Sequence, residues 1–437
     1  AKKRPDIDEN ILHFYGVHTL TSAVQKAAEP LLSRLRGNGS ITADDLFALP
    51  LGDEPKDVAL FEKEVEFCHS CMLCTNELPD LFMEQAALLP FDYALVPFPI
   101  AVALYILEKI GGLNAKLTWS IFITTLCWQA HIDLTVSHNP KRPRQRIRPR
   151  LPTYACAEPG SKKSPCLDTF LHSGVYKWLR DLFPYLLADT PAGYSFSGGS
   201  TAKACEQLLQ NDGYLGILVD EASSFFPLSM ATKGDVNKSQ HLKPQLLLPF
   251  RTGAPPERML LKRKKDLPAT QVAMVFLSQF PAARSFLVPI VKHLSIGWAQ
   301  GFIFTYSRDE PLFYDDEADD SAVLDFFVEL LEIVLRAYGP RASCLSVRMN
   351  ELSIPYYRLL HDMIQKCKLQ GFPDDSRNNF SKVGQWAPSY AFAAHAMREA
   401  CRYGQFRRSV ADLCEFKPEG SAWLAAEYPT CWTPDSQ

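Results

Sequence analysis

Between residues 154 and 306 the chain alternates short apolar runs with segments of helical periodicity. The apolar runs have the length and composition of buried strands and cover residues 154–157, 214–219, 271–277 and 302–306. Helices are expected between the first two runs, over residues 168–187 and 200–210. Strands that alternate with helices favour a parallel sheet covered by helices, which binds ligands beyond the carboxyl ends of its strands. The sequence therefore predicts an α/β fold.

The segment after the first of these strands has the residue types of a phosphate-binding loop. Residues 157–165 read Ala-Glu-Pro-Gly-Ser-Lys-Lys-Ser-Pro. In the pattern G-x-x-x-x-G-K-[ST] the Lys reaches phosphate oxygens and the hydroxyl binds Mg²⁺. Lys163 and Ser164 take these two positions, whereas Ala157 and Lys162 replace the glycines. The alternative is a solvated loop, and which of the two lysines faces phosphate stays open. The predicted nucleotide-binding residues are Gly160, Ser161, Lys162, Lys163 and Ser164.

An acidic pair follows the second strand. Asp220 and Glu221 come directly after the apolar run 215–219. Together with a phosphate loop, Asp220 and Ser164 would hold Mg²⁺, and Glu221 would polarise the attacking water. Gln279, at the tip of the strand expected beside the acidic one, would sense the outer phosphate of ATP. The predicted cofactors are thus ATP and Mg²⁺. The alternative is a strand whose end simply reaches solvent.

Further segments extend these two motifs into a family resemblance that covers roughly residues 77–400. The chain resembles the P-loop proteins of phages, plasmids and other mobile elements that are associated with primases and helicases. The loop at 158–165 looks like the family's "PGSGKSP" loop. The other similar segments are residues 77–79, 95–99, 201–211, 219–222, 274–279, 301–302, 380–382 and 391–395.

The resemblance implies a P-loop NTPase-like core of the RecA/AAA type that binds and hydrolyses ATP, acts on DNA and forms homo-oligomers. The sequence departs from the family at Lys162, after Phe302, where the usual Arg is missing, and at Tyr390, which replaces another common Arg. Such arginines neutralise charge on the transferred phosphoryl group. Arg284 and Arg308 are candidates for that role. The departures favour the alternative of a catalytically inactive scaffold or interaction module with the same fold.

Two basic segments are candidates for contact with DNA. A net charge of −3 gives the whole chain no attraction to nucleic acid, so any contact must be local. The first segment contains Lys141, Arg142 and Arg150 beside the residues that we predict to bind, and the alternative for both segments is a solvated face. The predicted nucleic-acid-binding residues are Arg144, Arg146, Arg148, Lys262, Arg263, Lys264 and Lys265.

The cysteines and the apolar runs limit the class of protein. Cys68, Cys71 and Cys74 suggest a metal-stabilised nucleic-acid-binding protein, but a helix over residues 57–74 would make Cys68 a core residue. The 12 cysteines lack the spacing of a disulfide framework and no signal peptide is evident, so an intracellular protein, cytoplasmic or nuclear, is expected.

The runs at 93–107 and 117–128 are too short to span a membrane and are expected to be buried helices.

The 437 residues divide into four expected regions. Residues 1–75 form a mostly helical region with a loop near residues 37–40, and 76–150 form a helical lead-in. Residues 151–310 are the P-loop NTPase-like core. Residues 311–437 form a helical domain with helices at 322–337, 354–369 and 390–402, in which His395 is expected to be a packed core residue. The acidic segment 309–320 is expected to be an exposed linker.

Overall fold

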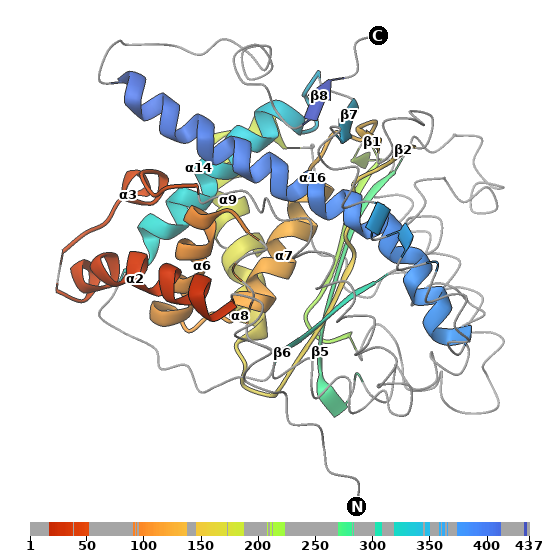
Figure 1. Cartoon of the computed structure of the whole chain (residues 1–437), viewed down its shortest axis with the longest axis horizontal. Coiled ribbons are helices and arrows are strands. Elements are labelled where there is room, and N and C mark those ends of the chain that lie inside the picture. Colours follow the sequence, from red (N-terminus) through yellow and green to blue (C-terminus); the bar gives the residue numbers. More distant parts are fainter. Residues whose placement is uncertain are drawn as a thin grey trace, which may run out of the picture.

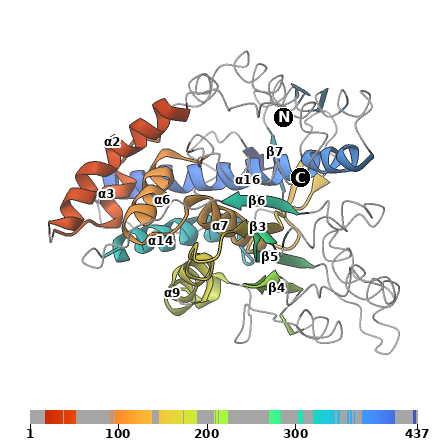
Figure 2. The same ribbon diagram turned by 90° about the horizontal axis from the view of Figure 1, so that it is seen from below.

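The centre of the protein is an all-parallel sheet of four strands (Figures 1 and 2). Its order is β4-β5-β3-β6, and the strands are β3 (Thr153–Ala157), β4 (Tyr214–Val219), β5 (Gln271–Gln279) and β6 (Ile303–Ser307). The predicted α/β class is confirmed. The computed structural model describes residues 17–37, 39–51, 91, 93, 96–137, 146–172, 174–187, 208, 210–211, 213–222, 270–281, 283, 302–307, 319–343, 346–349, 358–359, 361–362, 365, 374–411 and 432–434.

The strands agree closely with their expected ranges. β4 has the predicted bounds, while β3 begins one residue early and β6 is shifted by one residue. β5 continues two residues beyond the apolar run, through Ser278 and Gln279. Those two polar residues continue the strand because they pair with Cys156 and Ala157 of β3, so the backbone hydrogen bonding continues where the hydrophobic pattern stops.

Helices α6 (Phe98–Ile110) and α7 (Ala115–Trp128) overlap the two apolar runs, and both are buried as expected. Helix α6 begins five residues after the start of the run 93–107, directly after Pro97, and α7 begins two residues before the run 117–128. The side chain of Asn114 begins α7 by accepting hydrogen bonds from the backbone N–H groups of Lys116 (3.1 Å) and Leu117 (3.2 Å). Hydroxyl groups of α7 then bind the sheet: Ser120 Oγ lies 2.8 Å from Thr305 Oγ1, and Thr124 Oγ1 donates to Leu151 O. Helix α7 therefore runs antiparallel to the strands, and its first turn lies near their carboxyl ends. No helix in the described residues is long and apolar enough to cross a membrane.

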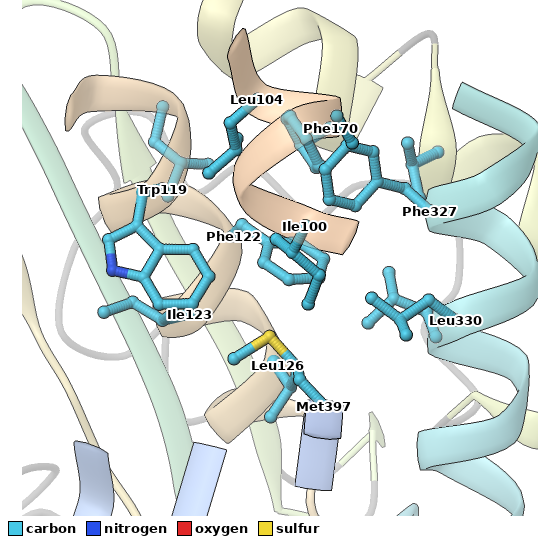
Figure 3. Close-up of a cluster of buried hydrophobic side chains, with 14 of the residues drawn as sticks. Ile100, Leu104, Trp119, Phe122, Ile123, Leu126, Phe170, Phe327, Leu330 and Met397 are labelled. Atoms are coloured by element: carbon cyan, nitrogen blue, oxygen red, sulfur yellow. The ribbon is translucent and has the colours of Figure 1, made fainter. Parts of the chain in front are cut away.

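A single hydrophobic cluster joins α7 to helices from distant parts of the sequence (Figure 3). Phe122 lies at its centre, with ring centroids 5.4 Å from Phe170 and 5.1 Å from Phe327. Phe327 belongs to α14 (Ser321–Tyr338), and Met397 comes from α16 (Asp374–Ala411). The cluster extends from Val24 to Cys401 and so includes residues from all four expected regions, whose division into domains stays a prediction.

The helix predicted at 168–187 is wrong in its bounds and continuity. A short helix, α8 (Lys163–Leu167), begins in the loop and continues into a π turn, η2 (Asp168–His172). Helix α9 (Val175–Leu182) and the 3₁₀ turn η3 (Pro184–Leu186) follow. The break occurs at Gly174, where a Cβ atom would lie 1.8 Å from Thr169 O, so only glycine allows this close approach of the backbone.

The C-terminal helices are only partly as expected. Helix α14 exceeds its predicted range by one residue at each end, but α16 has 38 residues instead of the 13 of the predicted segment 390–402. The first half of α16 is polar and has no apolar stripe, which is why the hydrophobic pattern missed it. Of the helix expected at 354–369, only residues 358–359, 361–362 and 365 are described, and they are helical. Leu208 and Gln210, the described residues of the segment 200–210, are helical too, whereas residues 57–74 lie outside the described part.

A second sheet, in the order β2-β1-β7-β8, was not predicted. Its strands are short, which leaves too few residues for a pattern of period two to be recognised. They are β1 (Thr135–Ser137), β2 (Arg146–Ile147), β7 (Ser346–Met349) and β8 (Trp432–Pro434). The N-terminal region contains α2 (Val17–Arg36) and α3 (Ala43–Phe47), which agrees with the helical region predicted there and with the loop between them.

Candidate functional site

The candidate loop joins the end of β3 to the start of α8 at the carboxyl edge of the sheet. Glu158 O accepts hydrogen bonds from the backbone N–H of Ser161 (3.3 Å) and from Nζ of Lys163 (2.9 Å), which closes the loop into a tight turn. Gly160 has φ = 87°, a left-handed conformation that glycine adopts without strain. Ser161 is buried beneath the turn. The loop therefore has a strand–turn–helix setting.

The two lysines of the loop face different ways. Lys163 Nζ folds back over the loop, where it also lies 3.3 Å from Ser161 Oγ. Lys162 Nζ instead donates to Gly111 O (3.3 Å), in the connection between α6 and α7. Lys162 also has φ = 52°, the left-handed conformation that explains why the motif has glycine at this position. Of the two, Lys163 is therefore the lysine whose ammonium group faces the loop.

The loop and the acidic strand meet directly. Ser164 Oγ donates a hydrogen bond of 2.6 Å to Asp220 Oδ2, although the two residues are 56 positions apart in the sequence. Asp220 is the first residue after β4, and half-buried Glu221 follows it. Ser164 and Asp220 thus bring a hydroxyl and a carboxylate oxygen together, which are ligands that Mg²⁺ accepts while it keeps several waters.

Gln279 lies between the loop strand and the acidic strand. In the register of the sheet, Ala157 pairs with Gln279, and β5 separates β3 from β4. Gln279 therefore extends β5 level with the last residue before the loop, on the strand beside the acidic one, as expected. Its side chain is half-buried. The structure brings Ser164 and Asp220 together by contact, and Gln279 to the same edge by register.

Uncharged groups lie below the loop. Burial raises the pKa of the Cys156 thiol, and the nearby positive charge of Lys163 opposes this rise. Burial also raises the pKa of the Tyr306 hydroxyl well above its ordinary value. Both groups are therefore neutral near pH 7. The lysines and carboxylates of the loop and of the acidic strand contribute charge at this edge.

One cation at this edge was missed in the sequence. Lys116, in the first turn of α7, donates from Nζ to Tyr306 O (3.3 Å), near the carboxyl end of β6. Tyr306 pairs with Cys156, one residue before β3 ends. No motif marks Lys116. Its position depends on α7 running antiparallel to the strands, which only the folded chain reveals.

The described part of the first basic segment, residues 146–150, lies at the opposite edge of the sheet. It precedes β3, whereas the loop follows β3. Arg146 is exposed on β2, and Arg148 lies 3.7 Å from Asp133. The prediction that Arg150 is solvated or faces DNA is wrong. Its half-buried guanidinium donates hydrogen bonds to Gln271 Oε1 (3.2 Å) and to Thr270 O, and desolvation lowers its pKa. It is a structural residue between β3 and β5.

Several predicted residues lie outside the described part of the chain. These are Cys68, Cys71, Cys74, Lys141, Arg142, Arg144, Lys262, Arg263, Lys264, Lys265, Arg284 and Arg308. Among the described residues, no group of three or more His, Cys, Asp or Glu side chains could hold a metal ion. A magnesium site of Ser164 and Asp220 needs no such group, because waters and phosphate oxygens complete the Mg²⁺ shell.

Tyr390 and His395 of α16 belong to the helical layer. The Tyr390 hydroxyl accepts a hydrogen bond from Trp119 Nε1 (2.9 Å), and its neighbour Ser389 accepts one from the backbone N–H of Arg150, at the amino edge of the sheet. Tyr390 therefore lies away from the loop. His395 is buried, as predicted, and burial together with the charges of Arg402 and Arg398 lowers its pKa to about 3.

Comparison with protein-family models, with curated proteins and with solved structures finds no match for this chain, so the geometry described above is the basis for a functional proposal.

Proposed function

We propose that the protein binds ATP with Mg²⁺ at the carboxyl edge of the parallel sheet and hydrolyses it, in a P-loop NTPase-like core of the RecA/AAA type. The observation that carries this proposal is the 2.6 Å hydrogen bond between Ser164 and Asp220. A phosphate loop and an acidic strand must meet at this pair of oxygens if both are to hold one Mg²⁺ ion.

Each residue has a defined role in the proposed reaction. Lys163 leaves Glu158 O and binds the outer phosphate oxygens of ATP. Ser164 and Asp220 would hold Mg²⁺, which would neutralise charge on the phosphates. Glu221 accepts a proton from the attacking water, and Gln279 contacts the outer phosphate. The water oxygen forms a bond to the outer phosphorus while the bond from that phosphorus to the bridging oxygen breaks, which gives ADP and phosphate.

The experiment is calorimetric titration of ATP with and without Mg²⁺, followed by assay of phosphate release. We expect binding that depends on Mg²⁺ and weakens at least tenfold, about 1.4 kcal/mol, in Lys163→Ala. Lys162→Ala is the matched control, because this adjacent lysine is turned toward Gly111 and its loss should leave affinity nearly unchanged. Glu221→Gln should bind ATP but release no phosphate. Absence of binding to the unaltered protein would refute the proposal.

A second candidate function is a scaffold that keeps the fold without hydrolysis. The left-handed conformation of Lys162 favours it, because a side chain stands where the motif uses glycine to let the loop approach phosphate. This candidate predicts that the unaltered protein and Glu221→Gln release phosphate equally slowly, even if ATP binds.

Action on DNA is the further part of the proposal. Among the described residues, the observation that supports DNA binding is the exposed position of Arg146, near Arg148 and at the edge of the sheet opposite to the loop. An Arg that contacts a phosphate of duplex DNA contributes about 0.9 to the slope of log affinity against log salt concentration. Arg146→Ala should therefore lower that slope by about one, whereas Arg36→Ala, an exposed change on α2, should leave it unaltered.

A further inference from the structure

Helix α9 lies at the periphery of the helical layer (Figure 2), and it has an exposed apolar face. The buried side of α9 consists of Val175, Tyr176 and Leu179. On another side, Leu182 is 63% exposed, and Tyr185 in the following turn is 54% exposed. These are the large hydrophobic residues with high exposure in the described part of the chain. Apolar side chains that form a contiguous exposed patch mark sites of association.

The aromatic end of this face is held in place. Arg336 of α14 donates a 2.8 Å hydrogen bond to the Tyr185 hydroxyl, and its guanidinium lies 5.7 Å from the Tyr185 ring centroid. Phe183 meets the same ring edge-on at 6.4 Å. Arg336 is in turn held by Glu332 at 2.7 Å. A fixed Tyr and Arg lose little side-chain entropy on association, and both are enriched where interfaces gain most of their energy.

Two charges border this face, and they determine which partner fits. Lys177 and Asp181 are exposed, lie four residues apart on α9, and take no part in the ion pairs of the described residues. When two copies of a helix pack antiparallel about a twofold axis, each residue meets its counterpart on the other side of the axis. An axis level with Leu179 brings each Lys177 opposite the Asp181 of the other copy.

We infer that this face, made of Lys177, Trp178, Asp181, Leu182 and Tyr185, is the contact surface of a homodimer. Each dimer contains two Lys177–Asp181 ion pairs around the apolar residues. The face consists of two turns of helix and the turn that follows. The surface that it can bury is therefore smaller than the roughly 800 Å² per partner of stable interfaces. The dimer is therefore weak and depends on protein concentration, and its contact surface does not include the proposed ATP site.

Charge reversal tests this pairing. Lys177→Glu alone places two carboxylates opposite each other in both contacts, and Asp181→Lys alone places two ammonium groups there. Each variant should weaken the dimer at least tenfold in sedimentation velocity measured over a range of protein concentrations. A one-to-one mixture of the two variants should form heterodimers, because every contact in the mixture again joins opposite charges. Both variants remain net negative, since the charge of −3 changes by two in each, so bulk attraction does not explain recovery.

Two further variants complete the test. Lys26→Glu makes the same change of charge at an exposed position of α2 and should leave dimerisation unaltered. Leu182→Glu should remove the dimer with no rescue by either charge variant. All these residues are exposed, so circular dichroism should show unchanged folding. A chain that stays monomeric at every concentration, or a mixture without heterodimers, would overturn the inference.

Discussion

Ser164 and Asp220 share a hydrogen bond of 2.6 Å that joins the first turn of α8 to the end of β4. A residue of the loop thereby contacts a residue of a strand that is separated from the loop strand by β5. The contact fixes how far the loop stands from the acidic pair. If Mg²⁺ binds here, Ser164 and Asp220 are the residues that would hold it, with the Ser164 hydroxyl keeping its proton but turning it away from Asp220.

This contact predicts different effects for two substitutions of Ser164. Ser164→Thr keeps the hydroxyl and should retain the dependence of ATP affinity on Mg²⁺. Ser164→Ala removes the hydroxyl and should abolish the effect of Mg²⁺, with at least a tenfold loss of affinity in its presence. Titration calorimetry with and without Mg²⁺ measures both. Equal behaviour of the two variants would show that the hydroxyl does not bind the ion.

The left-handed conformation of Lys162 predicts a large difference between two substitutions. Such a conformation costs a non-glycine residue about 1 kcal/mol, and a β-branched residue more. Lys162→Gly removes this strain, which stabilises the fold, but glycine also gives the unfolded chain more backbone freedom, which opposes folding. The free energy of unfolding should therefore change by less than about 0.5 kcal/mol. Lys162→Val should lose about 2 kcal/mol. Urea unfolding tests this, and equal stability of the two variants would contradict the assigned conformation.

Two buried glutamines should respond in opposite ways to replacement by methionine. Gln129 is fully buried, and neither polar atom of its side chain has a hydrogen-bond partner among the described residues. Gln271 donates to Cys127 O (2.7 Å) and Pro149 O (3.2 Å) and accepts from Arg150. Gln129→Met should raise the free energy of unfolding by about 1 kcal/mol, whereas Gln271→Met should lower it by about 2 kcal/mol or more. Thermal and urea unfolding measure both, and a destabilised Gln129→Met would refute the first part.

His395 should make stability depend on pH. Its pKa of about 3 in the fold lies below the ordinary value of 6.5, so only the unfolded chain takes up its proton between these values. Stability should therefore fall as pH drops below about 6.5, by roughly 2 kcal/mol at pH 5, and this contribution should level off near pH 3. His395→Phe should show a shallower decline in urea unfolding between pH 7 and pH 5. His361→Phe, at an exposed position, is the control and should keep the full decline. Equal slopes in all three proteins would contradict this prediction.

The sequence was sufficient to predict the parallel strands, because apolar runs of strand length stand out from the polar residues around them. The run 214–219 became β4 without change, and the order of the loop and the acidic pair predicted that Ser164 and Asp220 lie at one site, where the structure shows them in contact. Such strands and loops can be predicted from the sequence because the residues that define them are neighbours in the chain.

Other features could not be predicted because they depend on distant parts of the chain. Arg150 stands among five other basic residues in the sequence, yet it is half-buried and hydrogen-bonded where β5 begins. The strands of the second sheet are too short for a recognisable pattern, and β1 pairs with β7 more than 200 residues away. The direction of Lys162 toward Gly111 likewise depends on how α6 and α7 lie beside the loop.

The packing of α16 on α7 has a consequence for synthesis of the protein. Trp119 and Phe122 are made first, and Tyr390 and Met397, which cover the same cluster, follow more than 260 residues later. While it is attached to the ribosome, the growing chain therefore holds an apolar surface that α16 has yet to cover. At about 5–20 residues per second this interval lasts roughly 13 to 50 seconds, during which a chaperone that binds exposed apolar segments has time to protect α7.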